Sequence, residues 1–183
     1  VAGGSHSGEH LSSAEKYDPD TDTWEAIAPM SVPRKWFGFV ACRGYLYAIG
    51  GESEDDSLLD SCERYDPKKN AWEPIESLRA ARNGLAAVTD AQEQHIWAIG
   101  GASGSPGESY HEQYPVKCVE CLDIDDVGPG NWTNDEGGSD LPFAVDGFCA
   151  AVFDDRIWIF GGSRTSSSYD THSTVLVTQF DEK

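Results

Sequence analysis

The sequence predicts an all-β chain built from about three four-stranded antiparallel sheets. The first observation is a double glycine after an apolar run, which recurs about every 50 residues. It is found at Gly50-Gly51, Gly100-Gly101 and Gly161-Gly162. The second is a Tyr-Asp-Pro triplet at 17–19 and 65–67, with a tryptophan downstream each time. The third is the absence of helical apolar periodicity. Several features that recur in one order indicate a repeat protein.

Each repeat is expected to contain four short strands. The first is small and apolar, as at 38–42, and the second is the run that ends in Gly-Gly. That run is apolar on both faces, as a strand between two layers requires. The third strand ends at Tyr-Asp-Pro, because proline cannot donate to the ladder. The fourth strand starts at the tryptophan, as at 72–75.

The repeat boundaries divide the chain into four parts. Residues 1–30 form the end of one sheet, and residues 142–183 supply the first three strands of another. Between them, 31–78 and 79–141 each supply a complete four-stranded unit. Repeats of this kind need their neighbours to bury both sheet faces.

The Gly-Gly pair, the Tyr-Asp-Pro corner and the spaced tryptophan together resemble the kelch-repeat family over nearly the whole length. The resemblance implies a β-propeller in which each repeat is one blade. Three blades cannot surround an axis, so we expect a partial kelch β-propeller, about three blades of a six- or seven-bladed whole. The remaining blades would come from sequence outside these 183 residues or from a second copy.

Composition restricts the classes of partner. The 183 residues carry a formal net charge of −19, which repels nucleic-acid phosphate and anionic lipid. No stretch is long and apolar enough for a spanning helix. Five cysteines are an odd number without the density of a disulfide-rich secreted domain, so reduced thiols in the cytoplasm, or in the nucleus, are expected.

Motifs for catalysis or metal binding are weak. Cys118 and Cys121 are three apart on an expected strand, so their side chains point to opposite faces. The acids of 18–22 belong to a turn and lack the glycine and glutamate of a calcium loop. No catalytic triad can be assembled around the five histidines. We therefore expect no enzyme activity, no cofactor and no metal, although some kelch-like propellers are enzymes.

Recognition residues are expected on the loops that join strands two and three, and at the start of the first strand. Aligning Gly38 with Gly84 and Gly147 places Trp36, Arg82 and Val145 in one column. In the kelch substrate receptors of ubiquitin ligases, which this chain resembles, arginines near that column bind acidic peptides. Arg82 fits that pattern and Trp36 and Val145 do not. The predicted partner-binding rim comprises Trp36, Arg82, Glu54, Asp55, Tyr110, His111, Arg164 and Tyr169.

The sequence thus favours a non-enzymatic protein–protein interaction module for substrate recognition or scaffolding. Its partner is expected to be a protein or peptide, with basic or aromatic character given the charge of the chain. One alternative is a structural kelch component of a large assembly that binds through its sides. A kelch-type enzyme is the third alternative.

Overall fold

The computed structural model describes residues 1–105, 112–125, 128–134, 140–163 and 175–178. In this part of the chain the regular elements are all β-strands, which confirms the all-β prediction. None of the described segments is a helix long and apolar enough to span a bilayer.

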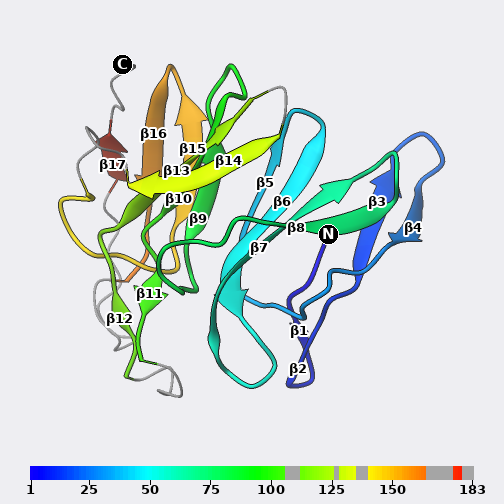
Figure 1. Ribbon diagram of the computed structural model, residues 1–183, viewed down its shortest axis with the longest axis horizontal. Helices are drawn as coiled ribbons and strands as arrows, with labels where there is room; N and C mark the ends of the chain where they lie inside the picture. Colours follow the sequence, from blue (N-terminus) through cyan, green and yellow to red (C-terminus); the bar gives the residue numbers. More distant parts are fainter. Residues whose placement is uncertain (106–111, 126–127, 135–139, 164–174, 179–183) are drawn as a thin grey trace.

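Two complete antiparallel sheets lie in the middle of the chain (Figure 1). The first has the order β5-β6-β7-β8 and consists of Gly38–Cys42, Tyr45–Glu52, Leu58–Asp66 and Ala71–Ile75. The second has the order β9-β10-β13-β14 and consists of Ala86–Thr89, His95–Ile99, Val119–Ile124 and Pro129–Asn134. These are the four-stranded units that the repeat pattern predicts.

Shorter sheets flank these two. A three-stranded sheet contains β15, β16 and β17, which are Cys149–Phe153, Arg156–Phe160 and Val175–Thr178. At the N-terminal side, β3 and β4 pair as Ala14–Asp18 and Thr23–Ile27. Two small hairpins are formed by β1 with β2, Ser5–His6 and Glu9–His10, and by β11 with β12, Ala102–Ser103 and Tyr114–Pro115.

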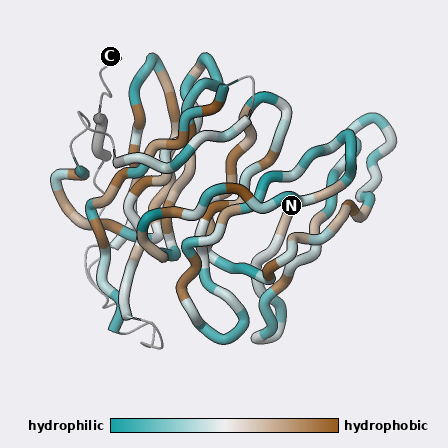
Figure 2. Tube along the Cα trace, viewed as in Figure 1, coloured by the Kyte–Doolittle hydropathy of each residue, from teal (hydrophilic) through white to brown (hydrophobic). Residues whose placement is uncertain are grey.

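The first strands of successive sheets adjoin one another, with β9 between β5 and β15. At Gly38 this contact is tight, since a Cβ there would lie 2.9 Å from the Cβ of Ala87. Figure 2 shows the apolar residues gathered in the strands and the polar residues in the turns. The two buried clusters lie where neighbouring sheets face each other, around Tyr47 and Ile96 and around Ile99 and Ile159.

The double glycines lie near the end of the second strand, where it meets the next repeat. Gly50 and Gly100 both have positive φ, 60° and 54°. A Cβ at Gly50 would lie 2.8 Å from the carbonyl oxygen of Arg82, and one at Gly100 would lie 2.7 Å from that of Val145. Glycine is therefore required here both for conformation and for space.

The tyrosine–tryptophan pairs join one repeat to the preceding one. Tyr65 and Trp72 are register partners, and their ring centroids are 5.2 Å apart. The indole of Trp72 donates to the carbonyl of Ala28 at 2.8 Å, and the indole of Trp132 donates to that of Glu76 at 2.9 Å. Each tryptophan thus anchors the segment that arrives from the preceding sheet.

Candidate functional site

One end of the sheets carries most of the projecting connections, and we call it the loop face. It is the lower end in Figure 1 and bears the β1–β2 hairpin, the turn at 53–57 and the β11–β12 hairpin. The first strands of the sheets begin at this end, and the second strands finish there. Of the predicted recognition residues, Trp36, Glu54 and Asp55 lie at this end.

The structure corrects the alignment of the predicted rim. Bridges join Lys35 to Glu52, Asn83 to Ala102 and Asp146 to Ser163, so Lys35, Asn83 and Asp146 are equivalent positions. The next residues, Trp36, Gly84 and Gly147, all have positive φ, at 53°, 61° and 62°. Trp36 therefore corresponds to Gly84, not to Arg82 as predicted.

Gly38 misled the alignment because it serves a different purpose. It lacks the positive φ of Gly84 and Gly147 and instead gives room for Ala87. Arg82 corresponds to Arg34 and Val145, because each of the three lies two residues before the residue with positive φ in its repeat. Alignment on glycine identity alone cannot separate a glycine that is needed for packing from one that is needed for conformation.

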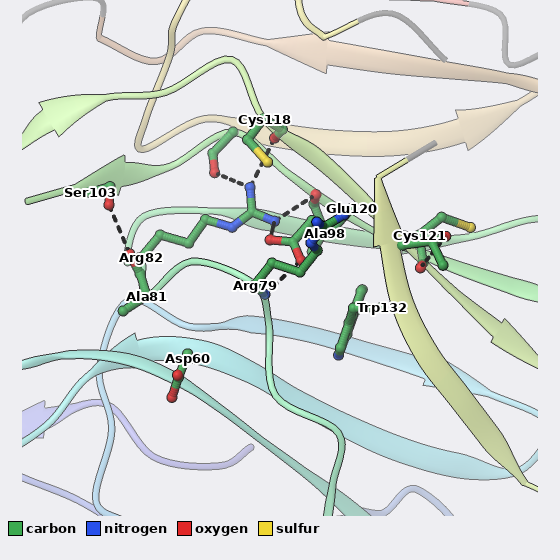
Figure 3. A network of polar contacts seen from close by, with 12 residues as sticks. Asp60, Arg79, Ala81, Arg82, Ala98, Ser103, Cys118, Glu120, Cys121 and Trp132 are labelled. Atoms are coloured by element: carbon green, nitrogen blue, oxygen red, sulfur yellow. Dashed lines mark hydrogen bonds and ion pairs between the residues drawn. The ribbon is translucent and has the colours of Figure 1, made fainter. Parts of the chain in front are cut away.

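Arg82 lies in the interior, so its placement on the exposed rim was wrong. Its exposed fraction is 0%. Its Nη1 donates to the carbonyls of Gly100 at 3.0 Å and Cys118 at 2.9 Å, and its Nη2 donates to Glu120 Oε1 at 2.9 Å (Figure 3). The guanidinium therefore ties together strands of one sheet and does not reach a partner.

Arg34 repeats this arrangement one repeat earlier. Its Nη1 donates to the carbonyls of Gly50 and Ser61, and its Nη2 donates to Glu63 Oε1 at 2.8 Å. The two glutamates also accept main-chain N–H groups from the incoming segment, Glu63 from Ser31 and Glu120 from Arg79, both at 2.8 Å. Each buried glutamate is thus paired with an arginine and accepts a main-chain N–H group, although the Nε atoms of Arg34 and Arg82 have no hydrogen-bond partner among the described residues.

Trp36 is a half-exposed aromatic side chain of the loop face, where Tyr114 of β12 is exposed as well. The exposed fraction of Trp36 is 50%, and its backbone occupies the left-handed region that a bulky side chain rarely adopts. The ammonium of Lys35 lies 4.3 Å from the indole centroid. Strain of this kind is retained where the surrounding structure or a function demands it.

A line of main-chain hydrogen bonds connects the three left-handed residues. The N–H of Gly84 donates to the carbonyl of Trp36 at 2.7 Å, and the N–H of Gly147 donates to the carbonyl of Gly84 at 2.9 Å. A Cβ at Gly147 would meet nothing within 4 Å. The surface at Gly147 is therefore open, whereas a Cβ at Gly84, next to Trp36, would lie 3.3 Å from the main-chain nitrogen of Gly147.

Polar side chains lie next to that open surface. Buried Glu52 accepts from Lys35 Nζ at 2.9 Å and from Asn83 Nδ2 at 2.7 Å, and Asn83 also donates to Gln113 at 3.1 Å. Asp146 is 9% exposed, and its buried Oδ1 has no hydrogen-bond partner among the described residues. Burial raises the pKa of the Asp146 carboxyl.

Two of the predicted rim residues lie in the exposed turn at 53–57. Glu54 and Asp55 are both exposed. The hydroxyl of Ser53 donates to Asp55, which lowers the pKa of that carboxyl. The other four predicted rim residues lie outside the described residues; they are Tyr110, His111, Arg164 and Tyr169.

The sequence analysis did not identify Lys35, Asn83 and Asp146 as site residues. A signal was present, because a polar residue precedes the left-handed residue in all three repeats. That signal becomes visible only when Trp36 is aligned with Gly84.

Cys42, Cys62 and Cys118 lack the environment of a catalytic thiol. All five cysteines are free. Burial raises the pKa of the Cys62 thiol to about 11, and it raises the pKa values of Cys42 and Cys118 as well. A reactive thiol needs the opposite shift, because the thiolate is the nucleophile.

Comparisons with known proteins agree with this fold. Residues 1–31 and 33–79 match the kelch motif. The N-terminal part of the chain carries kelch repeats. The chain as a whole superposes on the structure of YjhT with a TM-score of 0.75, over 98% of this chain and 62% of that one, at 15% sequence identity. The fold is therefore that of a kelch propeller.

Curated relatives match over little more than a quarter of the chain. The Influenza virus NS1A-binding protein homolog of Mus musculus is 43% identical over 53 residues, which is 29% of this chain and 8% of that protein. Kelch-like protein 1 of Mus musculus is 46% identical over 46 residues, 25% of this chain and 6% of that protein. The matched regions span less than a tenth of these relatives.

Proposed function

We propose that this kelch chain is a non-enzymatic protein-binding module whose loop face, around Trp36, binds a basic or aromatic segment of a partner protein. Kelch domains commonly mediate protein binding, which supports the general role. We propose the nature of the bound segment, the cellular role and the location together with this general role.

The observation that carries the proposal is the conformation of Trp36. The equivalent residues in the next two repeats are glycines, for which positive φ carries no steric cost. In this repeat the same backbone holds a half-exposed indole. Tryptophan is among the residues most enriched in interface hot spots, and a packing role would bury it.

Charge on the loop face favours a cationic partner. Glu54 and Asp55 project from the exposed turn, and Asp146 has a buried oxygen without a partner among the described residues. The net charge of −19 attracts basic chains over a longer range. A lysine or arginine of the partner can also stack on an indole.

The cellular role that we propose is substrate recognition or scaffolding, including a substrate adaptor of a ubiquitin ligase complex. Sequence similarity to Kelch-like protein 1 and Kelch-like protein 7 supports this choice over unrelated roles. The free cysteines agree with the cytoplasm or nucleus as the location.

Binding of the intact protein to immobilised peptide arrays tests the proposal. One array carries lysine or arginine beside tryptophan, tyrosine or phenylalanine, and the matched array has glutamate at the basic positions. We expect preference for the basic array and a loss of about 2 kcal/mol, roughly thirtyfold in affinity, for Trp36→Gly. Equal binding by wild type and Trp36→Gly would contradict the proposal.

A second candidate is a structural component that binds through the sides of its sheets. Its supporting observation is the Tyr17–Trp24 pair, whose rings are 5.2 Å apart and whose tryptophan is 55% exposed. Trp24→Ala serves as the matched control in the peptide assay. Loss of binding for Trp24→Ala, with Trp36→Gly unaffected, would favour the structural component.

A further inference from the structure

A histidine and two carboxylates from separate connections meet at the loop face. His10 ends β2, Glu52 ends β6, and Asp56 lies in the turn that follows β6. One donor atom of each lies within 4.8 Å of those of the other two. Among the described residues, no other group of three or more histidine, cysteine, aspartate or glutamate side chains comes this close together.

The imidazole of His10 is buried without satisfying its polar atoms. The residue is 9% exposed, and its Nδ1 is shielded from solvent with no hydrogen-bond partner among the described residues. A buried polar nitrogen in this state costs folding free energy unless something pairs with it. The carboxylates of Glu52 and Asp56 lie close by, but an ionised carboxylate cannot donate a hydrogen bond to an unprotonated nitrogen.

A positive charge already lies between the two carboxylates. The ammonium of Lys35 is 2.9 Å from Glu52 Oε1 and 3.7 Å from Asp56 Oδ1. The same ammonium also lies 4.3 Å from the centroid of the Trp36 ring, a contact that does not depend on the carboxylates. Lys35 can therefore leave the carboxylates without losing all of its stabilising contacts.

We propose that His10, Glu52 and Asp56 bind a divalent cation, Zn²⁺ or one of similar ligand preference, which replaces the ammonium of Lys35. One imidazole nitrogen with two carboxylate oxygens suits Zn²⁺, whereas Ca²⁺ and Mg²⁺ prefer oxygen ligands alone. Zinc–ligand distances of about 2.1 Å place donor atoms about 3.4 Å apart. The donors must close from 4.8 Å, and exposed Asp56 lies in a turn that can adjust.

The proposed ion would join two parts of the loop face that are far apart in sequence. His10 comes from the β1–β2 hairpin, and Glu52 and Asp56 come from the β6–β7 connection. Lys35, once displaced, would remain beside Trp36. Metal loading would thus change the charge next to the indole as well as stabilise the hairpin.

Metal titration of the intact protein, after removal of metal by a chelator, tests this site. Calorimetry with Zn²⁺ should give one-to-one binding, and Co²⁺ should give the visible absorption of a coordinated ion. We expect His10→Ala and Asp56→Asn each to weaken Zn²⁺ binding by about tenfold or more. Lys35→Met, which removes the competing charge, should strengthen it. His6→Ala, on the same hairpin but exposed, should leave it unchanged.

Two outcomes would overturn the proposal. The first is that the wild-type protein shows no one-to-one binding up to about 1 mM Zn²⁺. In that case the ammonium of Lys35 is not displaced, and the proposal fails even if the Lys35→Met variant binds Zn²⁺. The other is binding that survives both His10→Ala and Asp56→Asn. Circular dichroism of each variant separates loss of ligands from loss of fold, and Asp56→Asn alters only an exposed turn.

Discussion

Arg82 and Val145 occupy equivalent positions just before the first strands of successive sheets, β9 and β15. The backbone around the two residues is similar, but the side chains that fill the interior differ. The carbonyl of each residue approaches a double glycine, at 2.8 Å from a Cβ placed on Gly50 and at 2.7 Å from one placed on Gly100. Arg82 fills the interior with a buried ion pair to Glu120. Val145 is equally buried but belongs to an apolar cluster.

The glycines and main-chain hydrogen bonds set the geometry of the joint, by which we mean the contact between the double glycine of one repeat and the start of the next. Either a buried ion pair or an apolar side chain can fill the space beside it. An apolar filling is tolerant, because only volume must match. A buried ion pair is not, because removal of one partner leaves the other charged and unpaired. The two repeats should therefore respond differently to truncation.

Truncation of Arg82 should have the largest effect. Arg82→Ala leaves Glu120 buried without its counter-charge, and we expect a loss of about 3–5 kcal/mol in unfolding free energy. Val145→Ala removes only apolar contacts and should cost about 2 kcal/mol. Chemical denaturation of both variants measures the difference. A smaller loss for Arg82→Ala than for Val145→Ala would refute the contrast between the two interiors.

The glycines of the joint should show the next largest effect. Gly100→Ala places a Cβ 2.7 Å from the carbonyl oxygen of Val145 at a positive φ, so it combines a clash with backbone strain. We expect a loss of about 3 kcal/mol. Gly147→Ala has similar φ but open space, and should cost about 1 kcal/mol. Equal melting temperatures for the two variants would show that the close approach is not maintained in solution.

Asp146 should give a smaller effect that depends on pH. Burial raises its pKa in the folded state, so ionisation makes folding less favourable, and stability is lost as pH rises through that raised value. Asp146→Asn should be about 1 kcal/mol more stable than wild type at pH 7. The gain should vanish below about pH 4, where the carboxyl is protonated in both states.

Asp55 provides the matched control for this pH dependence. The hydrogen bond from Ser53 lowers its pKa, so it contributes stability at neutral pH that is lost as pH falls through the folded value. Asp55→Asn should therefore shift the melting temperature in the opposite direction from Asp146→Asn at pH 7. A gain for Asp146→Asn that is the same at pH 7 and pH 4 would exclude ionisation as its cause.

Trp36 should have the smallest effect on stability. Trp36→Gly relieves the left-handed strain and should raise the unfolding free energy by about 0.5–1 kcal/mol relative to Trp36→Ala, which retains the strain. Thermal melts of the two variants provide the test. A structural tryptophan would give the opposite order, with Trp36→Gly the less stable variant.

The fold could be predicted because its determinants are local. Gly50 and Gly100 follow the apolar run of their repeats, and the tyrosine–tryptophan pair recurs with the same offset at 17 and 24 and at 65 and 72, so both are visible in a single sequence. They specify where strands end and what lies between neighbouring sheets. The all-β class and the four-stranded units followed from them.

The site could be predicted only in part, because its determinants are conformational or distant in sequence. The left-handed backbone at Trp36 is concealed by its residue type, and this shifted the alignment that placed Arg82 on the rim. The partners Arg82 and Glu120 are 38 positions apart, and no repeated spacing marks them. The cluster of His10 and Glu52 likewise forms only when two connections meet in space.

The line of hydrogen bonds through Trp36, Gly84 and Gly147 uses main-chain atoms alone. Neighbouring repeats are therefore linked at this point by groups that every residue except proline possesses. At Trp36 and Gly147 the side chain can vary in size and charge at the cost of local strain, whereas a Cβ at Gly84 would lie 3.3 Å from the main-chain nitrogen of Gly147. New binding specificities can arise here by single substitutions, one repeat at a time, while the scaffold that presents them stays the same.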